Sequence, residues 1–166
     1  SCTGGSSVRP PSGLAHPAAG AVFDFGEHAG AAFLVMELVE GPTLAREIAR
    51  APLGVARALA LGAELADVLA AAHAIGLVHR DLTPSNVVIG RDRARVLDFG
   101  LAFLRAPGER GGAMGRLTRE GVVVGTPEYL SPEQARGEDV GPPTDVYALG
   151  CILHEVLTGQ PPFSGS

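Results

Sequence analysis

The chain has 166 residues, 46% of them hydrophobic, which is enough for one domain with a hydrophobic core. A net charge of −5 gives no basic surface for phosphates, so the composition argues against a nucleic-acid partner. Two cysteines, Cys2 and Cys151, are too few for a disulfide framework or a metal cluster, and we expect a reducing, cytoplasmic location.

We expect no membrane contact from this segment and find no signal-peptide pattern. The most apolar stretch, residues 59–77, carries two acids and a histidine, so we interpret it as a buried helix rather than a membrane span. Residues 1–13 are rich in Ser, Gly and Pro, which predicts disorder. The first residue is Ser and the first Met is Met36, so we expect a processed chain or part of a longer one.

The first predicted element is a β-hairpin. Two short apolar runs, residues 21–25 and 32–36, flank a polar turn that contains glycine. The sequence then predicts a helix from Thr43, which can cap it, to Arg50.

The next predicted helix is longer and amphipathic. We expect Pro52 to open it, because proline is favoured in the first turn of a helix. Apolar residues then recur every three or four positions, and Gly76 is a good residue to end the helix.

Two polar motifs follow and carry the chemistry. Residues 79–86 read HRDLTPSN, and residues 98–100 read DFG. Two short apolar runs between them, 87–89 and 94–97, predict a second hairpin. Phosphoryl transfer needs a carboxylate to orient the attacking hydroxyl and further oxygens to hold Mg²⁺, so Asp81, Asn86 and Asp98 are the candidate residues.

The remaining elements end in another helix. Residues 106–119 are polar and rich in Gly and Arg and are expected to be mobile, and residues 125–137 read GTPEYLSPEQARG. We expect Thr144 to cap a helix after Pro142-Pro143, with Asp145 in its first turn. That helix is apolar nearly all round up to Leu157, which predicts burial on every side.

Together these motifs resemble the eukaryotic-like serine/threonine protein kinases of bacterial type, from about Leu14 to Phe163. The resemblance implies an α+β, protein-kinase-like fold that is mostly the helical C-lobe, with a two-stranded remnant of the N-lobe. Residues 14–166 would form a partial kinase domain after the disordered residues 1–13. Within it, 14–36 would be the N-lobe remnant, 37–41 the hinge and 42–166 the C-lobe portion.

The same resemblance implies ATP and Mg²⁺ as cofactors and a protein with a Ser or Thr hydroxyl as the substrate. Asp81, Asn86 and Asp98 would be catalytic, and Asn86 and Asp98 would bind the metal. Met36 would lie behind the adenine and Val88 under it. The backbone C=O of Glu37 and N–H of Val39 would pair with the base.

Regulatory and structural roles are implied in the same way. Arg80 would dock a phosphate carried by Thr118, which lies between two arginines, or by Thr126. Thr126 would also brace Asp81. Four residues would be structural, with Asp145 holding the backbone of the 79–86 loop: His79, Phe99, Glu133 and Asp145.

The sequence also departs from the family pattern. It contains no glycine-rich phosphate loop and no Lys at all, and Thr83 stands where these kinases usually have Lys. We therefore expect the chain to be inactive by itself, as one segment of an active kinase. The alternative is a catalytically dead kinase-like module that acts as a binding or regulatory partner.

Overall fold

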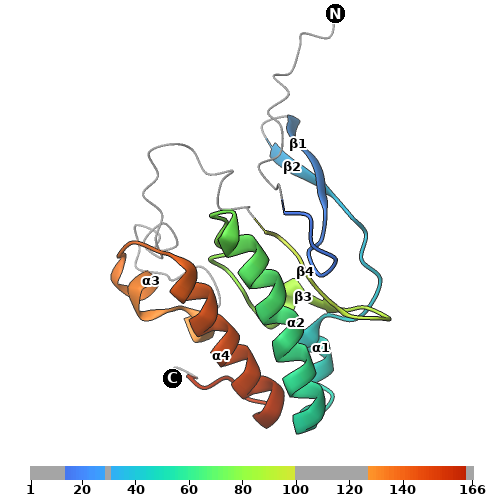
Figure 1. Ribbon diagram of the computed structural model, residues 1–166, viewed down its shortest axis with the longest axis vertical. Helices are drawn as coiled ribbons and strands as arrows, with labels where there is room; N and C mark the ends of the chain where they lie inside the picture. The colour runs from blue at the N-terminus through green and yellow to red at the C-terminus, as the bar shows by residue number, and fades with distance from the viewer. Residues whose placement is uncertain (1–13, 29–30, 100–126, 164–166) are drawn as a thin grey trace, which may run out of the picture.

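The computed structural model describes residues 14–28, 31–99 and 127–163, which form two small antiparallel sheets and a helical layer (Figure 1). The expected α+β class is confirmed. The described elements are β1 (Val22–His28), β2 (Ala31–Met36), α1 (Leu44–Ile48), α2 (Val55–Ala74), η1 (Pro84–Asn86), β3 (Val87–Ile89), β4 (Ala94–Val96), η4 (Pro127–Tyr129), α3 (Pro132–Arg136) and α4 (Pro142–Thr158).

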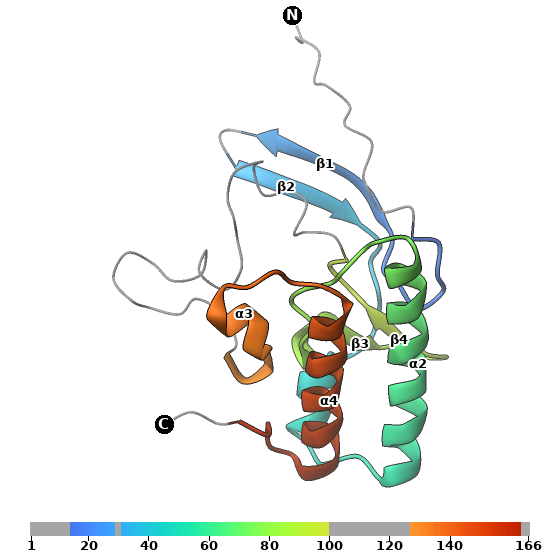
Figure 2. The same cartoon turned by 60° about the vertical axis from the view of Figure 1, so that its left-hand side comes forward.

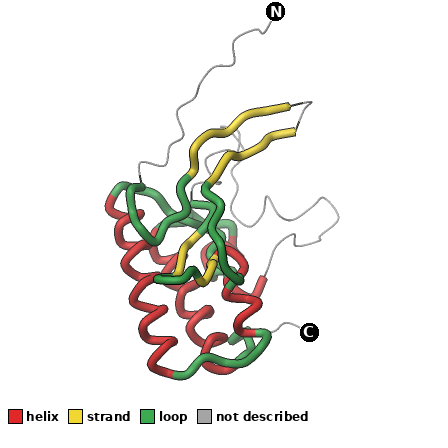
Figure 3. Tube along the Cα trace, turned by 90° about the vertical axis from the view of Figure 1, so that its right-hand side faces the viewer, coloured by secondary structure: helices red, strands yellow, loops and turns green. Residues whose placement is uncertain are grey.

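The first hairpin, β1–β2, projects away from the helices (Figure 2, Figure 3). It forms where the sequence predicts, but β1 continues through Gly26, which was expected in the turn. Gly26 lies opposite Phe33, and a Cβ on Gly26 would come within 2.6 Å of that ring. The missing side chain therefore makes room for the aromatic ring inside the sheet.

The second hairpin, β3–β4, forms where the sequence predicts, and most of its residues are buried. Val87 and Val96 are paired in register and are fully buried. Ala19 forms a parallel bridge to Val96, and Thr43 forms an antiparallel bridge to Val88. The hairpin is thus held between the chain that precedes β1 and the chain that follows the hinge.

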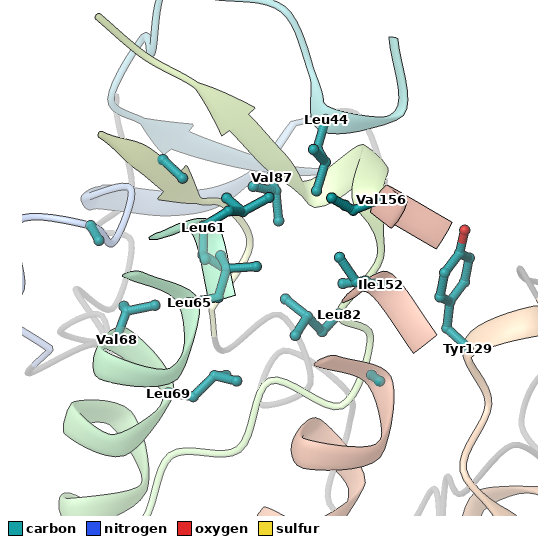
Figure 4. Packing of buried hydrophobic residues seen from close by; sticks show 14 of the residues in the cluster. Leu44, Leu61, Leu65, Val68, Leu69, Leu82, Val87, Tyr129, Ile152 and Val156 are labelled. Atoms are coloured by element: carbon teal, nitrogen blue, oxygen red, sulfur yellow. The ribbon is translucent and has the colours of Figure 1, made fainter. Parts of the chain in front are cut away.

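The core lies where α2 packs against α4 and against the strands (Figure 4). α2 and α4 come close together because Gly62 has no side chain, and a Cβ there would lie 3.1 Å from the Leu153 side chain. The labelled core side chains come from α1, α2, the loop of residues 79–86, β3, η4 and α4: Leu44, Leu61, Leu65, Val68, Leu69, Leu82, Val87, Tyr129, Ile152 and Val156.

The helix starts differ from the sequence prediction in two places. α2 begins at Val55 with Gly54 as its N-cap, so Pro52 does not open it. α4 begins at Pro142 with Gly141 as its N-cap, so Thr144 is not the cap. Proline suits the first turn of α4, because the N–H groups there have no partner within the helix.

The helix ends and α1 agree better with the sequence. Thr43 caps α1 by accepting a hydrogen bond from the N–H of Arg46, although the helix ends at Ile48 rather than Arg50. Gly76 and Gly159 follow α2 and α4 with φ of 75° and 77°, the left-handed conformation that glycine adopts without steric cost.

α4 is not buried on every side, contrary to the prediction. Val146 and Leu157 are 60% and 44% exposed, whereas Ile152 and Val156 are fully buried. The described residues cover only the face of α4 that packs against α2, η4 and the loop. Within the described ranges, the helices are all too short or too polar to cross a membrane.

The core predicts a clear difference between two leucines of α2. Leu65→Ala should lower the free energy of unfolding by about 2–5 kcal/mol, because it leaves a cavity at a side chain that is only 1% exposed. Leu59, on the same helix but 70% exposed, is the matched control, and Leu59→Ala should change stability by about 0.5 kcal/mol or less. Denaturant unfolding followed by circular dichroism measures both, and equal losses would contradict the packing described here.

Candidate active site

The loop that carries the first motif is held from below by Asp145. This side chain is fully buried in the first turns of α4. Its Oδ2 accepts from the backbone N–H of His79 and its Oδ1 from that of Arg80, both at 2.9 Å. His73 of α2 donates from Nε2 to Oδ2 at 2.7 Å. One carboxylate thus joins two helices and the loop.

Two site residues have a strained backbone. Arg80 and Asp98 have φ of 67° and 63°, and they are the described non-glycine residues with positive φ. Such conformations persist only where the surroundings impose them, and they concentrate at functional sites. For Arg80 the constraint is visible, because its N–H is held by Asp145 and its C=O accepts from Gln134 Nε2 at 2.7 Å.

His79 has a structural role in this geometry. Its Nε2 donates to the C=O of Leu97 at 2.9 Å, and its Nδ1 accepts from the N–H of Asp81 at 3.3 Å. Both ring nitrogens are therefore engaged, and the partners define the tautomer. The Phe99 ring packs edge-on against the imidazole with centroids 4.9 Å apart, so the second motif rests on the first.

Asn86 brings the three candidate catalytic residues together. Its side-chain Nδ2 donates to the C=O of Asp81 at 2.8 Å. Its own backbone C=O accepts from the N–H of Leu97 at 2.8 Å, immediately before Asp98. Asp81, Asn86 and Asp98 therefore converge on one region from two segments of the chain.

A capping box fixes the start of α3 next to the loop. The Ser131 hydroxyl accepts from the N–H of Gln134, and the Gln134 side chain accepts from the N–H of Ser131. Glu133 accepts a hydrogen bond from the Thr144 hydroxyl at 2.6 Å. This hydrogen bond lowers the pKa of the Glu133 carboxyl.

The predicted base-binding residues lie between β2 and the second hairpin. Met36 ends β2 and, like Val39, is half-buried, whereas Val88 is only 4% exposed. The backbone N–H of Glu37 donates to the C=O of Ala21 at 2.8 Å. The Glu37 carboxylate accepts from the N–H of Ala21 and from the guanidinium of Arg95. The Ala21 N–H, followed by Arg95, lowers the pKa of Glu37 against the opposing effect of its burial.

A small hollow, open to solvent, lies beside the loop. It is lined by Arg80, Asp81 and Thr83 of the loop and by Tyr129 and Gln134. Tyr129 is held there because its hydroxyl donates a hydrogen bond to the carboxylate of Glu155 on α4.

Some predicted residues lie outside the described ranges, namely residues 1–13, Gly100, Thr118 and Thr126. Other contacting residues were missed at the sequence level. His73 donates to Asp145, Gln134 donates to the C=O of Arg80 in the loop, Glu64 of α2 accepts from the N–H of Ala94 at 2.6 Å, and Arg95 binds Glu37. Only Gln134 had a usable signal, because Ser131 stands three residues before it in a capping-box pattern.

Comparison with known families decides the family of the chain. The model of the protein kinase domain matches residues 12–166. The chain belongs to the protein kinase family. It resembles serine/threonine-protein kinase pkn2 of Myxococcus xanthus, with 46% identity over 95% of this chain, and PknB of Mycolicibacterium smegmatis, with 44% identity over 92%. It spans only 19% and 24% of these two relatives.

Solved structures agree with this kinase fold. The PknI kinase domain of Mycobacterium tuberculosis superposes with a TM-score of 0.70 at 31% identity, over 90% of this chain and 52% of that one. Residues 1–466 of Rad53, solved in complex with AMP-PNP, superpose with a TM-score of 0.72 at 28% identity, over 93% of this kinase chain and 37% of theirs.

The oxygens available at the site suit a hard cation. Mg²⁺ in phosphate-transfer sites is usually bound by one or two protein oxygens together with phosphate oxygens and water. Asn86 Nδ2 donates a hydrogen bond to the backbone C=O of Asp81. This bond orients the side-chain amide of Asn86 so that its carbonyl oxygen lies on the opposite side. Asn86 and Asp98 would hold the ion, since Asp98 directly follows Leu97, whose N–H donates to the C=O of Asn86.

The loop geometry predicts that Asp145→Asn destabilises the protein more than the same substitution at an exposed aspartate. Asparagine offers one acceptor oxygen to three donors, so the free energy of unfolding should fall by roughly 2–4 kcal/mol. Amide hydrogen exchange should speed up at His79 and Arg80. The control is Asp67→Asn, at a side chain 76% exposed, and an equal effect of both changes would contradict the role of Asp145.

Proposed function

We propose that this kinase segment belongs to an enzyme that transfers the γ-phosphoryl group of ATP, with Mg²⁺, to a Ser or Thr hydroxyl of a protein. The observation that carries the proposal is the convergence of Asp81 and Asp98 through Asn86. The names of the relatives support the serine/threonine class, and the AMP-PNP of the Rad53 complex supports a nucleotide ligand.

In this mechanism Asp81 receives the proton of the substrate hydroxyl. The hydroxyl oxygen forms a bond to the γ-phosphorus, the bond from that phosphorus to the β,γ-bridging oxygen breaks, and ADP leaves. Mg²⁺ supplies positive charge to the phosphates when it is bound. Asn86 and Asp98 would hold it, and positioning of this kind accounts for most of the rate in phosphoryl transfer.

Val88 and the hinge would hold the base. Met36 would lie behind the adenine, and the C=O of Glu37 and the N–H of Val39 would pair with its edge. Val88 would contact the ring with the small part of its surface that is exposed. Arg80, which is exposed in the same loop, would bind a phosphate on Thr118 or Thr126 and so regulate the enzyme.

The second candidate is a catalytically dead module that binds a partner. It is favoured by the absence of Lys from all 166 residues and by Thr83, a buried neutral side chain that cannot supply charge to a phosphate. The coding sequence upstream of Ser1 separates the two candidates. A glycine-rich loop followed by a lysine in a strand supports the enzyme, and a reading frame without them supports the dead module.

The direct test of the proposed function uses the polypeptide as its gene encodes it. Asp81→Asn should lower kcat by about 10²- to 10⁴-fold while nucleotide affinity changes little, because Asp81 handles the hydroxyl and not the nucleotide. Asp92→Asn, at an exposed acid in the turn of the β3–β4 hairpin, is the control and should retain activity. A kcat above a tenth of the wild-type value in Asp81→Asn would refute the assigned role.

Asp98 should behave differently from Asp81. Asp98→Ala should weaken the binding of ATP in the presence of Mg²⁺ and have little effect on binding measured with EDTA, because the side chain acts through the ion. Fluorescence titration with a labelled ATP analogue measures both conditions. Equal losses with and without Mg²⁺ would show that Asp98 does not bind the metal.

A further inference from the structure

Arg95 of β4 joins three separate segments of the chain. Its Nη2 donates to Oε1 of Glu37, the first residue of the hinge, and its Nη1 donates to the C=O of Pro17 at 2.6 Å. The side chains of Arg95 and Glu37 are only 23% and 33% exposed. A guanidinium can hold two acceptors in a fixed geometry because its donors form a planar fork.

The other end of the hinge is also fastened to the same hairpin. The N–H of Ile89 in β3 donates to the C=O of Pro42 at 2.9 Å. Gly41 passes so close that a Cβ there would lie 2.3 Å from the Ile89 carbonyl oxygen, and its φ is 143°. The hinge, residues 37–41, is therefore fixed at its start by a side chain and at its end by backbone contacts.

The strand register connects Arg95 to the expected floor of the base site. In the β3–β4 hairpin Arg95 is paired directly with Val88. One residue thus contacts the floor through its backbone and the hinge through its side chain. A change of its position would alter the spacing between the two surfaces that a flat base would lie against.

We propose that Arg95 is a positioning residue for nucleotide binding, which holds the hinge at the distance from β3 that an adenine base requires. This inference rests on the proposed function. A purely stabilising role explains the contact less well, since partly exposed ion pairs add little to stability. Moreover, Arg95 Nε is buried without a hydrogen-bond partner among the described residues, which a site selected for stability alone would avoid.

The test separates the base from the phosphates of the nucleotide. Affinities for adenosine, for ATP with Mg²⁺ and for inorganic tripolyphosphate are measured on the polypeptide as its gene encodes it. Arg95→Ala should weaken adenosine and ATP by the same factor, about three- to tenfold, and leave tripolyphosphate unchanged. In the phosphotransfer assay the loss should raise KM for ATP far more than it lowers kcat.

Matched variants make the result specific. Arg95→Lys retains a cation for Glu37 and should recover most of the lost adenosine affinity. Arg93→Ala, at an exposed arginine in the turn of the same hairpin, should bind adenosine like the wild type. On a Glu37→Gln background, Arg95→Ala should have a smaller effect than on the wild type, because the two side chains act through one contact.

The outcomes distinguish the two proposals. A wild type that binds no ATP refutes the proposed function and this inference with it. A wild type that binds ATP, together with an Arg95→Ala variant of unchanged adenosine affinity, refutes only the role of Arg95. Equal losses for adenosine and tripolyphosphate would show a general structural effect and would also overturn the inference.

Discussion

The site depends first on one buried carboxylate, that of Asp145. A charge with no solvent contact is tolerated only when donors replace the lost water, and here the donors are two backbone N–H groups of the loop and His73 of α2. The loop and α2 lie 65 to 72 residues from Asp145 in the sequence. Packing of α2 on α4 and folding of the loop are therefore one coupled event.

Short polar contacts connect Asp145 to the rest of the site. Arg80 can keep a positive φ because Asp145 holds its N–H and Gln134 of α3 holds its C=O. His79 then positions the second motif through the Leu97 carbonyl and the Phe99 ring. Asp81 and Asp98 lie outside helices and strands, and Asn86 ends the short η1, but these segments are tied to rigid elements, which is what precise positioning requires.

Local patterns explain which parts of the fold could be predicted. Both hairpins follow from short apolar runs around polar turns, and α1 follows from its Thr43 cap. The ends of α2 and α4 follow from glycines in the left-handed conformation. The predicted starts of α2 and α4 were wrong. More than one residue near each start can begin the helix: within residues 52–55 for α2, and Gly141 or Thr144 as the cap for α4. The exposure of Val146 was missed, because apolar composition does not show how many neighbours a helix has.

The site was predictable only where chemistry determines residue type and spacing. Asp81, Asn86 and Asp98 stand out because their order is constrained by a reaction. The contact of Arg95 with Glu37 spans 58 residues, so it becomes visible only in the folded chain. Supporting residues that lie outside the motifs, such as Arg95 and His73, therefore escape the sequence, although the residues that would react do not.

The contacts also divide the proposed function into base binding and phosphoryl transfer, which would use different side chains. Base binding would use the hinge, Val88 and Arg95, none of which contacts the loop of the first motif among the bonds described here. Chemistry would use Asp81 and Asn86, with Thr83 beside them as a buried, neutral side chain. Within the proposed function, Thr83 would bear on the rate of transfer, through the charge it cannot supply to a phosphate, rather than on the binding of the base. A nucleotide-binding chain with slow or absent catalysis is compatible with the same contacts, which is why affinity and kcat must be measured separately.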